Sequence, residues 1–253
     1  MKHIINWKIF FILLIACVLT ALMVIPYSLE LTAIEVKITP LILALTVIQN
    51  LIMFAIVIFF GLILSKQIGM GLPIIENILE KKNQTKEITS ILIPSIILGL
   101  AAGVLIVLLA LFFNIHELNN SEISISPWKA FLASFYGGIG EEVLLRLFLV
   151  SLFVWITFKI KKSKDGMPTN FGVWLSIFLS AIVFGLGHLP TTAQIVPLTG
   201  IIILRAIVLN GVGGIIFGWL YWKKGLESAM IAHFSADIVL HIITPFIMVT
   251  FFT

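Results

Sequence analysis

The sequence predicts an all-α protein, a polytopic transmembrane bundle of about seven to eight helices around a polar cavity within the membrane. The chain has 253 residues, of which 60% are hydrophobic and only 11% charged, and its mean hydropathy is +1.17. Soluble domains carry about 25% charged residues. Several apolar runs exceed the roughly 20 helical residues needed to cross a bilayer. These runs are continuous rather than alternating, which favours helices over a β-barrel.

The apolar runs define seven expected spanning segments, at residues 9–27, 40–65, 91–113, 127–158, 171–189, 196–222 and 226–252. The first segment follows Lys2 and Lys8, but it is longer than the apolar core of a usual signal peptide and no clear cleavage site follows it. We therefore expect a retained anchor. Pro245 is a candidate break in the last segment, because proline removes a backbone donor. The single cysteine, Cys17, excludes an intramolecular disulfide.

Basic residues are distributed unequally between alternate connections. One set of connections carries Lys2, Lys8, Lys66, Lys81, Lys82, Lys86, Lys159, Lys161, Lys162, Lys164, Lys223 and Lys224. The other set carries Lys37 and Lys129, beside Glu30, Glu35, Glu117 and Glu122. By the positive-inside rule, the N-terminus is expected in the cytoplasm and the C-terminus outside. The net charge of +4 is thereby explained by topology, so the expected partner is the lipid bilayer and not nucleic acid.

A small set of ionisable residues lies inside the expected spans. The set comprises Glu141, Glu142, Arg146, His188, Arg205, His233, Asp237 and His241. One such charge at the bilayer centre costs on the order of 2.5–3.5 kcal/mol. The usual reasons to keep one there are a hydrated cavity, mutual pairing, or a path for protons or ions.

The stretch GGIGEEVLLRLFLV, residues 137–150, contains three of these charges. Glu142 and Arg146 are four residues apart, so they share a helical face and can pair. This pair either locks the helix or takes part directly in chemistry. Glu141 lies about 100° around the helix and cannot make the same contact. It is therefore a candidate general base, and the preceding glycines would let a neighbouring helix or a substrate come close.

Two further stretches carry polar side chains at helical spacing. In AIVFGLGHLP, Phe184 and His188 share a face, and in AHFSADIVLH, His233 and Asp237 do, with His241 as a weaker candidate one turn on. Each stretch alone is equally typical of a structural histidine. Together they supply enough groups to activate water and stabilise an oxyanion, or to hold a divalent metal such as zinc. The sequence lacks the H-E-x-x-H and G-x-S-x-G motifs of other hydrolases, and one intramembrane aspartate cannot form an aspartate dyad.

On these stretches the sequence resembles the CPBP family of intramembrane proteases, which includes CAAX prenyl endopeptidase-like and bacteriocin-processing proteins and is also called the Abi family. The family pattern is E-E-x-x-x-R, then F-x-x-x-H, then H-x-x-x-N or D. Here it reads EEVLLR at 141–146, FGLGH at 184–188 and HFSAD at 233–237. The resemblance covers roughly residues 127–241, and the first three segments show none.

The resemblance implies an intramembrane endopeptidase with assigned residue roles. Glu141 would activate the attacking water with His188 alongside, and His233 and Asp237 would stabilise the oxyanion. The site-ordering residues would be Glu142, Arg146 and Phe184. The resemblance leaves the cofactor open between none and a divalent metal such as zinc, because a metal-free glutamate mechanism explains the same residues. The family is also commonly called a metalloprotease, and the candidate ligands would be Glu141, His188, His233 and Asp237. Asp237 stands where asparagine is commoner, and an ionised aspartate cannot donate to an oxyanion.

The resemblance also implies a division of the chain and a class of substrate. Residues 1–126 would form N-terminal membrane helices with a polar cytoplasmic connection, and residues 127–253 would form the catalytic helices. The substrate would be a peptide or a lipidated protein, such as a prenylated tail or a hydrophobic peptide precursor. Two alternatives remain: a catalytically silent regulatory or bacteriocin-immunity protein of the same fold, and a small proton-coupled transporter. The expected location is the cell membrane if the protein is bacterial, and the family analogy favours a site open to the cytoplasm.

Overall fold

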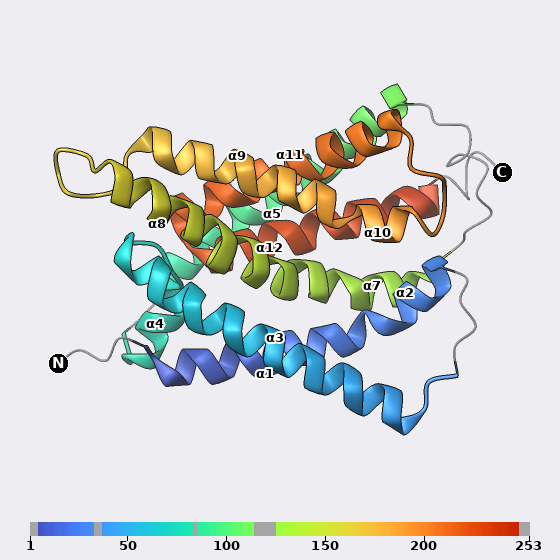
Figure 1. Cartoon of the computed structure of the whole chain (residues 1–253), viewed down its shortest axis with the longest axis horizontal. Coiled ribbons are helices and arrows are strands. Elements are labelled where there is room, and N and C mark those ends of the chain that lie inside the picture. Colours follow the sequence, from blue (N-terminus) through green and yellow to red (C-terminus); the bar gives the residue numbers. More distant parts are fainter. Residues whose placement is uncertain (1–4, 33–36, 83–84, 114–124, 248–253) are drawn as a thin grey trace.

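Seven long helical spans run side by side and form the body of the protein (Figure 1). The structure, a computed structural model, describes residues 5–32, 37–82, 85–113 and 125–247. Within these residues the spans are Trp7–Thr32, Pro40–Gln67, Thr85–Phe113, Pro127–Ile160, Asn170–Thr192, Gly200–Lys224 and Leu226–Ile247. Each is long and apolar enough to cross a membrane, so the predicted polytopic helical bundle is confirmed.

The spans are divided into shorter elements where the backbone changes. The elements are α1 (Trp7–Met23), α2 (Ile25–Thr32), α3 (Pro40–Gln67), α4 (Pro73–Leu79), α5 (Thr85–Phe113), α7 (Pro127–Phe135), η1 (Tyr136–Glu141), η2 (Val143–Val150), α8 (Ser151–Ile160), α9 (Asn170–Gly187), α10 (Leu189–Thr192), α11 (Gly200–Lys224), α12 (Leu226–Ile238) and η3 (Val239–Ile243). The three η elements are π-helical and wider than an α-helix. Such turns are rare and often accompany functional sites.

Several of the spans begin at a side-chain cap. Thr39, Thr169 and Thr199 each accept a backbone N–H from the third residue beyond, at 3.3, 3.0 and 3.4 Å respectively. Asn6 does the same for the first span. Such caps satisfy backbone donors that the first helical turn leaves without an intrahelical partner. They fix where these spans start, and hence which residues lie at a given depth.

The outer faces of the bundle are apolar, and polar contacts lie between helices. Leu41, Phe112 and Phe171 are among many large hydrophobic side chains that remain exposed. A water-soluble monomer rarely exposes such continuous apolar surface, whereas lipid tails would cover it. Inside, the hydroxyls of Ser95 and Ser228 lie 2.6 Å apart across α5 and α12. Interhelical hydrogen bonds between small residues of this kind are typical of membrane helix bundles.

One hydrophobic core joins the two halves of the chain. It contains Ile9, Cys17 and Phe54 from the first two spans together with Val143 and Ala232 from later ones. Cys17 is buried as a packing residue. On α5, a Cβ at Gly99 would collide with the backbone carbonyl of Ala232, so the glycine allows α5 and α12 to approach closely. The helices before residue 127 therefore form part of the wall around the later ones.

The last span does not break at Pro245. The helix continues from Leu226 to Ile247, and the π-helical η3 immediately precedes the proline. Proline lacks an N–H and its ring crowds the carbonyl four residues earlier. The wider π turn relieves that crowding, which explains why the chain stays helical where a break was expected.

The two ends of the bundle differ in their connections. In Figure 1 the N-terminal end of α1, the helix α4 and the loop between α8 and α9 lie together at one end, which we call the lysine-bearing end. The helices α3, α8 and α11 also finish there, in or beside Lys66, Lys159 and Lys224. At the opposite end, Lys129 pairs with Glu30 at 3.1 Å. The described lysines are thus divided between the two ends of the bundle as the sequence predicts. Lys2, Glu35, Glu117 and Glu122 lie outside the described residues.

Candidate active site

A buried ion pair occupies the middle of the fourth span. Glu142 and Arg146 are almost completely buried, and Nη1 of Arg146 lies 2.8 Å from Oε1 of Glu142. The pairing expected from their spacing is thus confirmed. The guanidinium group also lies between two aromatic rings, 5.2 Å from the centroid of Phe184 and 5.4 Å from that of Phe217. A desolvated cation–π contact is worth about 2 kcal/mol, which helps offset the cost of burying the charge.

His233 on α12 is held against this pair. Its Nδ1 lies 2.6 Å from the same Oε1 of Glu142, and its ring stacks on Phe217 with centroids 4.7 Å apart. The Glu142 carboxylate is an acceptor, so Nδ1 of His233 carries a proton in this hydrogen bond. The contact fixes the ring orientation and turns Nε2 away from Glu142. Ordering an imidazole through one nitrogen is how many sites present the other nitrogen for chemistry.

Two carboxylates face the free nitrogen of His233. Nε2 lies 3.8 Å from Oε2 of Glu141 and 3.6 Å from Oδ1 of Asp237. Glu141 is the more accessible of the two, with 24% of its side chain exposed against 11% for Asp237. Both separations are too long for direct hydrogen bonds. The carboxylate oxygens of Glu141 and Asp237 therefore remain able to accept hydrogen bonds in the space beside Nε2 of His233.

Glycines on η1 allow α12 to come this close. A Cβ at Gly137 would collide with Oδ2 of Asp237 and would lie 3.2 Å from Nε2 of His233. A Cβ at Gly138 would lie 3.0 Å from Cβ of Phe234. The π-helical turns η1 and η2 run through the same stretch and surround the two adjacent glutamates. Of the glycines before Glu141, Gly137 thus faces the cluster residues of α12, whereas Gly138 faces Phe234 and Gly140 faces Tyr136.

His188 belongs to the rim of this arrangement. It lies at the C-terminal end of α9, where its Nδ1 is 2.9 Å from the carbonyl oxygen of Phe184. The Phe184 ring packs edge-on against His188 and against His233, with centroids 4.8 and 5.8 Å away respectively. Among the described residues, no hydrogen bond or ion pair joins His188 to Glu141. The role alongside Glu141 expected for His188 remains a prediction.

A tyrosine that the sequence analysis did not single out extends the cluster. Nε2 of His241 lies 3.9 Å from Oδ1 of Asp237, and its Nδ1 lies 3.4 Å from the hydroxyl of Tyr27 on α2. Tyr27 comes from the first span, which carries no motif. Its only sequence signal is a phenol in an apolar run, and the pairing becomes visible only in three dimensions.

The cluster does not form a ready-made metal site. In the part of the chain that the structure describes, no group of three or more His, Cys, Asp and Glu side chains is arranged to hold a metal ion. His233 and His188 each hold Nδ1 against an oxygen, of Glu142 and of the Phe184 carbonyl respectively, which leaves Nε2 of each ring available, as is common in metal-ligating histidines. The described side chains are nevertheless not grouped as a ligand set, so the expectation of a divalent metal such as zinc at Glu141, His188, His233 and Asp237 remains a prediction.

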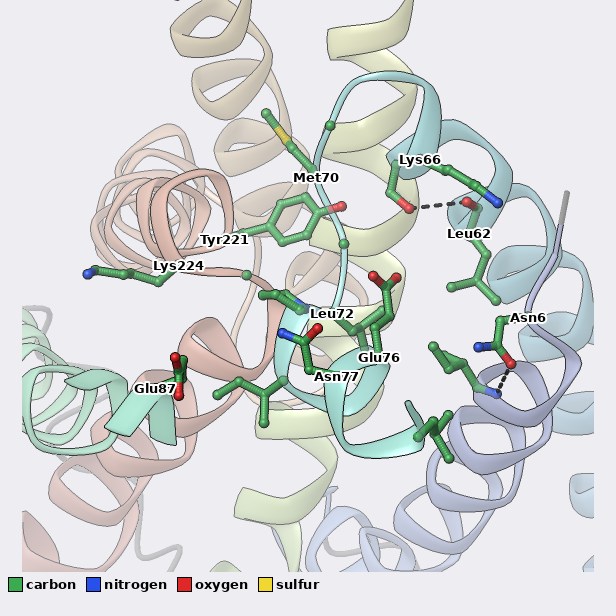
Figure 2. A pocket seen from close by; sticks show the side chains of 18 of the residues that line it. Asn6, Leu62, Lys66, Met70, Leu72, Glu76, Asn77, Glu87, Tyr221 and Lys224 are labelled. Atoms are coloured by element: carbon green, nitrogen blue, oxygen red, sulfur yellow. Dashed lines mark hydrogen bonds between the residues drawn. The ribbon is translucent and has the colours of Figure 1, made fainter. Parts of the chain in front are cut away.

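A separate cavity opens at the lysine-bearing end. Its volume is about 1090 Å³, and Figure 2 shows Asn6, Lys66, Glu76, Tyr221 and Lys224 among the side chains that line it. None of the cluster residues on η1, α9 or α12 is part of its lining. This cavity therefore has the volume of a ligand site and carries the carboxylates of Glu76, Glu80 and Glu87, but its described lining includes no histidine.

Glu76 on the short helix α4 lies in this cavity, outside the spanning segments. Burial raises the pKa of the Glu76 carboxyl above its ordinary value. The charge of Lys66 opposes the shift and that of Glu80 adds to it. The carboxyl of Glu76 is thus more easily protonated in the folded protein than in the unfolded chain.

Comparison with known protein families agrees with this geometry. The model of the family described as type II CAAX prenyl endopeptidase Rce1-like matches residues 123–239. This part of the chain is Rce1-like. The resemblance to CAAX-type proteases expected from the three motifs is confirmed over these residues, which make up somewhat less than half of the chain. Together with the seven apolar spans, it fits an integral membrane protein. No curated protein and no solved structure matches the chain.

Within the Rce1-like region lie Glu141, Glu142, Arg146, His233 and Asp237. Phe184 and His188 are also inside it, whereas Tyr27 and His241 are outside. The match thus covers the buried residues of the cluster and does not include Tyr27 and His241, which extend the cluster.

Proposed function

We propose that the protein is an intramembrane endopeptidase of the CAAX type that uses Glu141 as its general base. The observation that carries the proposal is the placement of Glu141 Oε2 3.8 Å from Nε2 of His233, with Asp237 Oδ1 3.6 Å from the same nitrogen. A partly exposed carboxylate beside an oriented imidazole is the arrangement that water activation requires. The Rce1-like match supports the reaction class independently.

In the proposed reaction, Glu141 accepts a proton from water while the water oxygen bonds to the carbonyl carbon of the substrate. The carbonyl oxygen becomes an oxyanion. The carbon–nitrogen bond then breaks, and the proton held by Glu141 passes to the leaving nitrogen. General acid–base catalysis of this kind contributes about 10²–10⁴-fold to the rate.

His233 would stabilise the oxyanion. With both ring nitrogens protonated, it donates through Nδ1 to Glu142 and through Nε2 to the oxyanion. Glu142, Arg146 and Phe217 hold the ring in place for this role. Asp237, which cannot donate when ionised, would act through His233 by balancing its charge from 3.6 Å away. Loss of one donor to an oxyanion costs about 10²–10³-fold in rate.

The substrate we propose is a peptide bound to the membrane, either a lipidated protein tail such as a prenylated one or a hydrophobic peptide precursor. The exposed apolar faces of the spans support a protein that meets such substrates within the bilayer. We further propose that the lysine-bearing end faces the cytoplasm, following the positive-inside rule. That orientation places the N-terminus in the cytoplasm, in the cell membrane if the protein is bacterial.

The test is cleavage of a peptide library by the purified protein in liposomes, with prenylated and unprenylated peptides compared by mass spectrometry. Glu141→Gln should abolish cleavage, whereas Glu87→Gln, an acid at the exposed start of α5, should leave it unchanged. Cleavage that persists in Glu141→Gln would overturn the proposal. Proton flux without cleavage would favour the transporter, and a function retained by Glu141→Gln would favour a regulatory or immunity protein.

The same assay addresses the metal. We propose that activity survives dialysis against a chelator, because the described side chains form no preassembled ligand set. Activity that is lost on chelation and restored by zinc would show instead that the metal assembles its own site, with Glu141, His188, His233 and Asp237 as candidate ligands.

A further inference from the structure

The polar cluster continues beyond the residues that the proposed reaction uses. One helical turn past Asp237, His241 places its Nε2 3.9 Å from Oδ1 of that aspartate. The hydroxyl of Tyr27 lies 3.4 Å from the other nitrogen of His241, and the two rings pack edge to face with centroids 5.7 Å apart. Asp237 therefore lies between two imidazoles, since Nε2 of His233 is 3.6 Å from the same oxygen.

Tyr27 can set which nitrogen of His241 faces Asp237. A phenol that donates to Nδ1 leaves the proton of a neutral imidazole on Nε2. Nε2 is the nitrogen directed at Asp237, so the proton is directed toward the carboxylate. A ring without that contact could rotate or exchange tautomers and present an acceptor to another acceptor. The pair thus favours one orientation of the Asp237 carboxylate.

The surroundings of His241 contain few competing charges. The groups that act on it electrostatically are His233 and His188, in addition to its contacts with Asp237 and Tyr27. Tyr27 is in turn influenced by Asp237 and Glu141.

Among the residues that the structure describes, the neighbouring helices bring no further ion pair to His241. On α5, the only charged residues are Lys86 and Glu87 in its first turn, whereas Gly103 is the residue that meets Val239 of η3. On α7, Lys129 is paired with Glu30. Among the described contacts of His241, Asp237 is therefore the carboxylate toward which its ring is oriented.

His241 is more accessible than the two cluster residues that precede it on this span. The exposed fraction of the side chain rises from 6% at His233 to 11% at Asp237 and 39% at His241. The described contacts of His241 run to Asp237 and Tyr27 and not to Glu141 or Glu142. His241 and Tyr27 would therefore act on the site through Asp237.

We propose that Tyr27 and His241 are positioning residues of the active site, which hold Asp237 in the orientation that supports His233. The inference rests on the proposed peptidase function. Both residues lie outside the Rce1-like region at 123–239, so the first span completes a site that the recognisable half of the chain does not complete alone. Outer partners of this kind typically change activity by about 10–100-fold.

The experiment measures kcat and KM in liposomes for Tyr27→Phe, His241→Leu, His241→Gln and the double variant Tyr27→Phe/His241→Leu. We expect His241→Leu to lower kcat about 10–100-fold with KM changed less than about twofold. His241→Gln, whose amide can direct an N–H toward Asp237 as Nε2 of His241 does from 3.9 Å, should recover most of the loss. The double variant should be no slower than His241→Leu, because Tyr27 acts only through His241.

Additive losses in the double variant, failure of glutamine to rescue, or an unchanged kcat in His241→Leu would each overturn the inference. Tyr221→Phe, which removes a buried hydroxyl at the lysine-bearing end, is the control and should keep the wild-type kcat. If Glu141→Gln is inactive while His241→Leu matches the wild type, the inference alone fails. If Glu141→Gln remains active, the proposed function fails.

A second measurement does not depend on turnover. In detergent-solubilised protein with ¹⁵N-labelled histidine, the two imidazole nitrogen shifts of His241 at one fixed pH report which ring nitrogen carries the proton. Tyr27→Phe should change these shifts, and Tyr221→Phe should not. Unchanged His241 shifts in a folded Tyr27→Phe protein would overturn the inference.

Discussion

Replacing Gly137 with alanine tests whether the closeness of η1 and α12 serves the chemistry. The added Cβ would collide with Oδ2 of Asp237 and lie 3.2 Å from Nε2 of His233, so both side chains must move. Overpacking of this kind costs about 1–3 kcal/mol in unfolding free energy, and the better helix propensity of alanine returns at most about 1 kcal/mol. The expected net loss of stability is therefore about 3 kcal/mol or less.

The effect on catalysis should be much larger. Every acid and imidazole of the cluster is still present in Gly137→Ala, but Asp237 and His233 are displaced. A misplacement of about 1 Å can cost about 10²-fold in rate. We expect kcat to fall about 100-fold while the protein stays folded.

Gly138→Ala is the matched control. Its Cβ would meet the same helix less tightly, 3.0 Å from Cβ of Phe234 and 3.1 Å from the carbonyl oxygen of Met230, and it would not touch Asp237 or His233. It should lose stability within the same range of about 1–3 kcal/mol and less than about tenfold in kcat. Gly211→Ala, with no atom within 4 Å of the added Cβ, gives the baseline for helix propensity alone.

The assay combines peptide cleavage in liposomes with thermal unfolding of each variant in detergent. Equal kcat in Gly137→Ala and Gly138→Ala would refute the reasoning, because the approach of η1 would then have no specific link to the acid–imidazole cluster. A Gly137→Ala protein that unfolds far more readily than Gly138→Ala would also refute it, since the loss would then be structural.

Three further changes have defined outcomes. Arg146→Met should lower the unfolding free energy by about 3–5 kcal/mol, because it leaves the buried Glu142 without its cation. Thermal unfolding in detergent measures the change, and a loss below about 1 kcal/mol would contradict the prediction. Tyr221→Phe removes a 2.7 Å hydrogen bond to the buried Ser151 and should lower the unfolding free energy by about 1–3 kcal/mol, measured by thermal unfolding in detergent. Peptidase activity should stay unchanged. A change in activity per folded molecule would show that the lysine-bearing end is not separate from the acid–imidazole cluster. Glu76→Gln should stabilise the protein at neutral pH, because the raised pKa of this carboxyl favours the folded state only below the ordinary carboxyl pKa and that contribution is lost as pH rises through the folded pKa. The advantage of glutamine in unfolding free energy should therefore vanish near about pH 4. An advantage that is equal at about pH 4 and at neutral pH would refute this prediction.

The spans were predictable because their signal is local. Apolar runs and the lysines between them located all seven spans, with most ends within a few residues of those found in the described chain. The contact between Glu142 and Arg146 was predictable for the same reason, since helical spacing alone places them together. The continuity of the last span through Pro245 was not, because a π turn is not visible in residue spacing.

The site was predictable only in part. Spacing within one helix indicated that His233 and Asp237 share a face, but nothing in the sequence placed Glu142 against Nδ1 of His233. That contact depends on the geometry with which α12 crosses the fourth span. The glycines on η1 allow the two helices to come close, but they do not determine the crossing geometry. Tyr27 was missed because its partner lies 214 residues away in the chain. The roles of Glu141, His188, His233 and Asp237 remain predictions for the cleavage assays.

The close approach of α5 to α12 limits how the motif-bearing helices could be transplanted. Gly99 and Gly103 of α5 lie against Ala232 and Val239, on the same helical stretch that carries His233 and Asp237. A graft of those helices onto another scaffold would need a glycine-faced neighbour in the same place, or that stretch would lose its backing. The Rce1-like region is therefore not a self-contained module, and a design built from its motifs alone would lack α5 as a support.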